Sequence, residues 1–167
     1  MFGDTVLAPA SGVILAIWSN DTGLGPESSL LIEHSSKDLD LADAQVSHLS
    51  EFNHLSMGDI SHLQKGDRIE RGQPIGIVRY PGGNPQFTAE VHWEVYEIVT
   101  TQLSQTSWSV PNSKSTSWWN EAAILIDPLY LLSQGQEDLE TKQIHIEPFR
   151  TKSDKEYSGF TYHLRCA

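Results

Sequence analysis

The sequence predicts an all-β domain built from antiparallel strands, and three observations support this prediction. Short segments rich in β-favouring residues follow one another through the first hundred residues. Turns that contain glycine, proline or aspartate separate these segments. No long segment shows the apolar period of about 3.6 residues that is typical of a surface helix. Strands without long helices are the pattern of an antiparallel all-β domain.

The individual elements follow from local patterns. A Pro/Ser/Gly turn precedes the β-rich run that ends at Trp18, and a glycine-proline turn divides the segment 69–78 before another strand. The expected strand segments are Thr5–Pro9, Gly12–Trp18, Ser29–His34, Gln45–Leu49, Ile69–Val78 and Glu90–Ile98, with a hairpin connection over Lys37–Ala42. Glu90–Ile98 is expected to be a central strand. One helical turn is expected over Asp127–Leu132, because proline follows an aspartate cap there.

Length and composition predict one domain followed by an extension. A chain of 167 residues is long enough for a single hydrophobic core. We place the domain at residues 1–132 and a C-terminal extension of unknown role at residues 133–167, where the chain becomes polar and charged. The extension holds two alternating runs, 144–146 and 160–164, which are expected to pair as a hairpin or to pack on the core.

Charge and cysteine content exclude several classes of function. Eleven Lys and Arg against 22 Asp and Glu give a net charge of −11, which argues against general affinity for nucleic acid or anionic lipid. The single cysteine, Cys166, excludes an intramolecular disulfide framework and a cysteine-based zinc cluster. No apolar run approaches the roughly 20 residues of a membrane span, and Met1–Asp4 does not resemble a signal peptide. Work outside the cytoplasm would require another export route or a longer parent chain.

The strictly alternating run at 90–98 is the most informative segment for chemistry. Its period places Glu90, His92, Glu94 and Tyr96 on one face and the apolar residues between them on the other. A carboxylate and an imidazole two residues apart can reach one metal ion or one water molecule. The alternative is an ordinary solvated polar face.

The other histidines are weaker candidates. His48 is a second candidate for the site, with a hydrogen-bonded structural role as the alternative. His34 ends a strand and is not expected to be a ligand. We expect the remaining histidines to face solvent and assign them no role: His54, His62, His145 and His163. The glycines match no phosphate-binding loop.

Several phrases, taken in order, resemble the lysostaphin-like (LytM-type) zinc metallopeptidases that cut peptidoglycan cross-bridges. Gly3–Ile14 resembles the family's G-x-x-V-x-A-x-x-x-G-x-V entry, and Lys65–Gly76 resembles G-x-x-V-x-x-G-x-x-I-G. Three shorter segments match further family phrases: Leu31–His34 resembles I-x-H, Val46–Ser50 resembles Y-x-H-L, and Glu90–Glu94 resembles H-L-H-F-E. The closing D-P-x-x-x-L is matched at Asp127–Leu131. The resemblance covers about residues 3 to 132 and implies the antiparallel sheet or sandwich of that family.

The resemblance implies an incomplete zinc site. In the family, an upstream H-x-x-x-D pair and the second histidine of H-x-H hold Zn²⁺, and two further histidines act on the bound water. His92 matches the third metal ligand and His48 one catalytic histidine, whereas Glu90 stands where the other is expected. The H-x-x-x-D pair is expected just before Gly3, close to where this sequence begins. A catalytic zinc needs three protein ligands, so we expect zinc to bind weakly or not at all. A His48/Glu90/His92 set around a shifted ion is the alternative.

Three functions are therefore carried forward. The first is a catalytically impaired, peptidoglycan-directed domain of the cell envelope or extracellular space, which binds peptidoglycan peptides or a cell-wall hydrolase partner. The second is an active zinc endopeptidase with a remodelled or externally completed metal site. The third is a structural module of a larger secreted or phage-like assembly, because function resides in sites and not in folds. Trp108, Trp118 and Trp119 are expected either to line a glycan or peptide groove or to anchor a loop.

Overall fold

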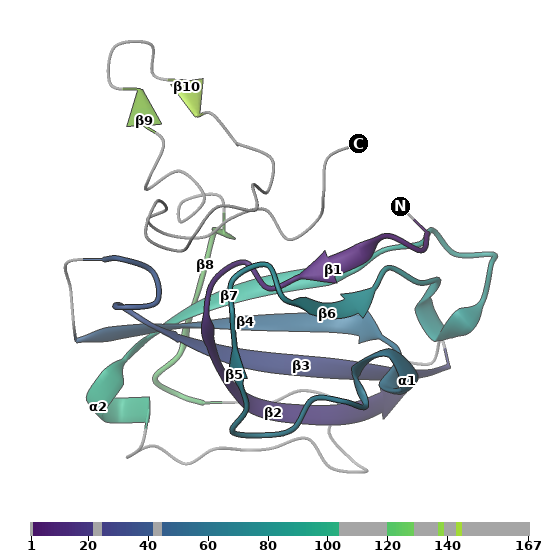
Figure 1. Cartoon of the computed structure of the whole chain (residues 1–167), viewed down its shortest axis with the longest axis horizontal. Helices are drawn as coiled ribbons and strands as arrows, with labels where there is room; N and C mark the ends of the chain where they lie inside the picture. Colours follow the sequence, from purple (N-terminus) through teal and green to yellow (C-terminus); the bar gives the residue numbers. More distant parts are fainter. Residues whose placement is uncertain are drawn as a thin grey trace.

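A computed structural model describes residues 2–21, 25–41, 45–103, 120–128, 137–138 and 143–144. Its main feature is a six-stranded sheet with the order β5-β2-β3-β4-β7-β8, in which every neighbouring pair is antiparallel (Figure 1). The strands of this sheet are β2 (Gly12–Asp21), β3 (Pro26–Ser35), β4 (Val46–Leu55), β5 (Arg68–Ile69), β7 (His92–Val99) and β8 (Ile124–Ile126). The predicted antiparallel all-β class is confirmed at this level.

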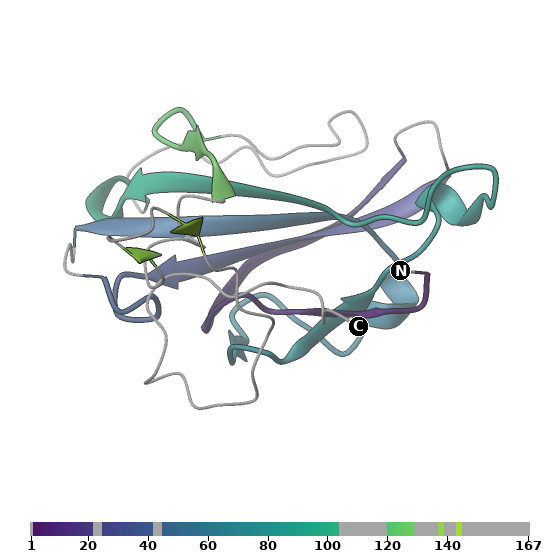
Figure 2. The same ribbon diagram turned by 90° about the horizontal axis from the view of Figure 1, so that it is seen from above.

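A second, smaller layer lies against one face of the sheet, which we call the inner face (Figure 2). It is formed by β1 (Thr5–Leu7) and β6 (Pro74–Ile77), which pair antiparallel, with α1 (Met57–Ile60) beside them. Two further short helices are η1 (Pro81–Gly83) and α2 (Thr100–Leu103). The main core fills the space between the layers, and its largest members include Leu30, Ile32, Phe52, Ile60, Ile69 and Ile75.

The opposite face of the sheet, the outer face, has a smaller apolar cluster. Leu31, Leu49 and Ile98 are buried there together with Trp18. Tyr96 is partly buried against the same cluster. Beyond this cluster the outer face carries polar side chains, and this division positions the candidate site.

Gly12 shows why the sheet requires one particular glycine. A Cβ atom at this position would lie 2.4 Å from the carbonyl oxygen of Glu33 and 2.8 Å from Nδ1 of His34. Real Cβ atoms do not approach backbone oxygens so closely, so β2 can run beside β3 here only without a side chain.

The segment 90–98 confirms its predicted alternation but not its predicted place. Trp93 and Val95 pack into clusters on the inner side, and the neighbouring positions of β7 point to the outer face. However, β7 is the fifth of six strands in the sheet order and therefore lies next to the edge strand β8 instead of at the centre. Glu90 precedes the strand and makes an isolated bridge with Arg79.

Some predictions lie outside the described residues. These include the tryptophans 108, 118 and 119, most of the helical turn expected at 127–132, and most of the extension 133–167. Within the extension, β9 (Glu137–Asp138) pairs antiparallel with β10 (Gln143–Ile144). Among the described residues, none of the helices has the length and apolar character needed to cross a bilayer.

Candidate ligand-binding site

The structure does not bring His48 together with Glu90 and His92. In the β4–β7 ladder His48 lies opposite Glu97, whereas His92 lies opposite Asn53, five residues further along β4. At about 3.3 Å per residue this separates the two histidines by roughly 16 Å along the strands. Because five is an odd number, their side chains also point to opposite faces of the sheet. The predicted convergence of His48 with Glu90 and His92 is therefore wrong.

His48 instead belongs to the inner face, where it is paired with His34 across β3 and β4. His34 is fully buried. Its Nδ1 donates to the carbonyl oxygen of Ser11 at 2.8 Å, so Nε2 of the neutral ring accepts from Oγ of Ser50 at 2.9 Å. Burial lowers the pKa of His34 to about 4 and also lowers the pKa of His48. We interpret both as neutral histidines of the folded interior.

A third histidine, His54, takes the position next to His92. It lies in a β-bulge where Ser29 of β3 faces two residues of β4, Asn53 and His54. His54 has a φ of 65°, which is uncommon outside glycine but is adopted more readily by histidine than by most residues. The bulge turns its imidazole toward Glu27, whose Oε2 accepts from Nδ1 at 2.8 Å. The expectation that His54 faces solvent without a role is corrected, because its side chain is only 13% exposed.

Three further side chains extend this group. Nε2 of His54 lies 3.7 Å from Oε1 of Glu90, and the rings of His54 and His92 have their centroids 6.3 Å apart. His92 in turn donates from Nε2 to Oε1 of Glu94 at 3.1 Å. We call these five residues (Glu27, His54, Glu90, His92 and Glu94) the histidine-carboxylate cluster. Glu90 and His92, the two other predicted site residues, are therefore brought together, but with His54 in place of His48.

The sequence contained a signal for His54. Phe52-Asn53-His54-Leu55 has an aromatic residue at the first position of a Y-x-H-L pattern, where Val46-Ser47-His48-Leu49 has valine. The two segments lie six residues apart, and the structure places His54 of the second segment, and not His48 of the first, beside His92. The strand in fact continues to Leu55.

Polar residues continue from the cluster onto the outer face. Oγ of Ser29 bonds to Oδ1 of Asn53, whose Nδ2 donates to Oε1 of Glu51 at 3.0 Å. Tyr96 donates to Oε2 of Glu94 at 2.7 Å. Burial, together with the Glu94 carboxylate, raises the pKa of Tyr96, so the phenol stays protonated. The cluster is thus one end of a connected hydrogen-bonded network.

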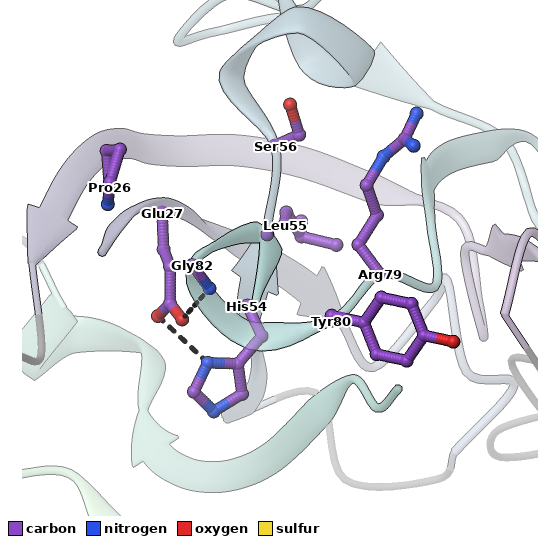
Figure 3. A pocket seen from close by; sticks show the side chains of 9 residues that line it. Pro26, Glu27, His54, Leu55, Ser56, Arg79, Tyr80 and Gly82 are labelled. Atoms are coloured by element: carbon purple, nitrogen blue, oxygen red, sulfur yellow. Dashed lines mark hydrogen bonds and ion pairs between the residues drawn. The ribbon is translucent and has the colours of Figure 1, made fainter. Parts of the chain in front are cut away.

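A pocket of about 160 Å³ opens beside His54 (Figure 3). Glu27 lies in its wall, with its side chain 2% exposed, and its Oε1 accepts from the backbone N–H of Gly82 at 2.9 Å. Figure 3 shows Glu27, Gly82 and His54 on one side of the pocket and Arg79 and Tyr80 on the other. Glu27 therefore links β3, the bulge of β4 and η1, and it fixes the shape of the pocket.

The donor set of the cluster does not fit a catalytic zinc ion. Zinc in hydrolases needs three protein ligands and an open position. Across the part of the chain that the structure describes, no group of three histidine, cysteine, aspartate or glutamate side chains is arranged to hold a metal ion. Nε2 of His92 is committed to Glu94.

Comparisons with protein families, with curated proteins and with solved structures found no match for this chain.

Proposed function

We propose that this chain is a lysostaphin-like domain of the cell envelope that binds peptidoglycan peptides, or a hydrolase partner, without cutting them. One observation carries the proposal. The segment at 52–55, which takes the place of Val46–Ser50 as the match to the Y-x-H-L phrase, meets the segment at 90–94 in space through His54 and His92. Their meeting supports a site of the same origin at this end of the sheet.

Glu90 supports binding in preference to hydrolysis. It occupies the position of a catalytic histidine in the family phrase, and its carboxylate faces His54 at 3.7 Å. The cluster can hold and orient a polar ligand through its hydrogen-bonding groups, and zinc is expected to bind there weakly or not at all.

A zinc endopeptidase is the second candidate, and the contact between Glu27 and His54 is the observation that favours it. Metal-binding histidines usually donate their other ring N–H to a carboxylate, as Nδ1 of His54 does. Cleavage of peptidoglycan that depends on a metal ion would favour the endopeptidase, and binding without cleavage would favour the first proposal.

Co-sedimentation with purified peptidoglycan tests the proposed binding. The wild-type chain is expected to pellet with the polymer and to be released by soluble peptidoglycan peptides. The variant Glu90→Gln tests the cluster, and Glu97→Gln is its matched control, because Glu97 is a similarly exposed glutamate that lies 3.8 Å from His48 on the inner face. Binding that is absent from the wild type, or that both variants weaken equally, contradicts the proposal.

A further inference from the structure

The bulge in β4 decides which face of the sheet His54 occupies. Phe52 is buried in the main core on the inner face. If side chains alternated regularly from there, His54 would also point to the inner face and Leu55 to the outer face. Leu55 is instead buried in the same core as Phe52, because the register shifts where Ser29 meets two residues of β4. The bulge therefore returns Leu55 to the core and places His54 beside His92.

Residue 54 bears the backbone cost of this arrangement. Its φ of 65° lies in the left-handed region, where a Cβ atom crowds the following carbonyl oxygen. In one common class of bulge the residue in this conformation is glycine, which has no Cβ atom. Among the described residues, only Asp40 and His54 combine a side chain with a positive φ. Such residues persist only where the surrounding structure holds them, so His54 needs a group that holds it.

Glu27 of β3 supplies a contact that can do this. Its side chain is 2% exposed. Its Oε2 accepts from Nδ1 of His54 at 2.8 Å, and its Oε1 accepts from the backbone N–H of Gly82 at 2.9 Å. Figure 3 shows that both contacts start from this one side chain. Because one oxygen is anchored at η1, the other presents a fixed acceptor to the bulge.

We propose that Glu27 is a positioning residue, whose carboxylate holds His54 in the left-handed bulge conformation and so keeps the imidazole beside His92. The contact offsets the backbone cost at residue 54, and the site is formed before any ligand arrives. The benefit for ligand binding rests on the proposed function, whereas the placement of His54 does not.

NMR signals of residue 54 in the full chain test the proposal. Its Cα and Cβ shifts report its backbone conformation, and an NOE between the rings reports the proximity of His54 and His92, whose centroids are 6.3 Å apart. In Glu27→Ala we expect the shifts to leave the left-handed range and the NOE to be lost. Glu33→Ala is the matched control, because Glu33 is another partly buried glutamate of β3 and accepts from Ser47 at 3.0 Å. Both signals are expected to persist in the control.

A glycine at position 54 separates positioning from a general structural role. Glycine adopts a positive φ without the cost of a Cβ atom. Glu27→Ala should therefore change the Cα shifts of Asn53 and Leu55 in the wild-type background, but much less in the His54→Gly background. Glu27→Gln keeps the size of the side chain and one acceptor oxygen. It is expected to show the same changes at smaller amplitude, and it carries the test if Glu27→Ala fails to fold.

The proposal is overturned if residue 54 of the wild type is not left-handed, or if both Glu27 variants leave its signals unchanged. It is also overturned if Glu33→Ala has the same effect, or if loss of Glu27 acts equally with histidine and with glycine at position 54. Affinity for soluble peptidoglycan peptides is measured separately, and Glu27→Ala is expected to weaken it at least about tenfold. An unchanged affinity would overturn the role of Glu27 in binding. A wild-type chain that binds no peptide contradicts the proposed function, and the NMR test of Glu27 still stands.

Discussion

Acidification should unfold this protein partly through His34. The imidazole is fully buried, and burial lowers its pKa from 6.5 to about 4. The unfolded chain therefore binds a proton at a higher pH than the folded chain does. Its contribution to stability is fully present above pH 6.5, is lost as the pH falls toward 4, and does not change further below that.

The size of this effect follows from the shift. A full proton difference corresponds to about 1.4 kcal/mol per pH unit, but the difference is only partial near pH 6.5 and near pH 4.5, so moving between these values should cost about 2 kcal/mol of unfolding free energy. Urea denaturation between pH 7 and 4.5 measures the loss for the wild type and for His34→Gln. Glutamine is neutral at all these pH values and retains a donor and an acceptor for Ser11 and Ser50.

The difference between the two proteins isolates His34, because all other titrating groups are shared. The wild type is expected to lose about 2 kcal/mol more than His34→Gln over this range. Parallel losses in both proteins would refute the reasoning, since they would show that the buried imidazole does not resist protonation.

Three further predictions concern the core, an ion pair and the metal. Phe52→Ala is expected to lower the unfolding free energy in urea by about 3–5 kcal/mol, because Phe52 is fully buried and stacks on Trp93; a loss below about 1 kcal/mol would contradict the core assignment. Asp59→Asn should cost no more than about 1 kcal/mol in the same assay, because its partner Arg79 is 40% exposed; a much larger loss would mean that this pair organises the pocket. Glu90→His is expected to raise zinc affinity in calorimetry about tenfold or more, since it adds an imidazole near His54 and His92. The variant is not expected to gain peptidase activity. Unchanged zinc affinity would argue against the placement of residue 90 beside these two histidines.

The fold could be predicted from the sequence where a local pattern determined it. The strict alternation of 90–98 placed Trp93 and Val95 on the inner side and His92 and Glu94 on the other, because the side-chain period of a strand is two. The hairpin between β3 and β4 followed from the polar connection at 37–42. The position of β7 next to an edge strand depends on β8, a three-residue strand whose pairing no local pattern announces.

The candidate site could be predicted only in part, because a bulge assembles it. Glu90 and His92 were found from their spacing, but the position of His54 depends on two residues of β4 facing one residue of β3. Nothing in the alternation of β4 indicates that shift. Nothing in the sequence indicated that Glu27 belongs to the site, because charged residues are rarely buried without a partner. Its partners, His54 and Gly82, lie 27 and 55 residues away in sequence.

A peptidoglycan-release assay with the wild-type chain and added Zn²⁺ tests the central claim most directly. If the domain binds without cutting, the polymer should keep its turbidity and release no soluble peptides, with zinc or with a chelator. Release of peptides that zinc supports and a chelator abolishes would contradict the account and would establish the chain as a zinc endopeptidase.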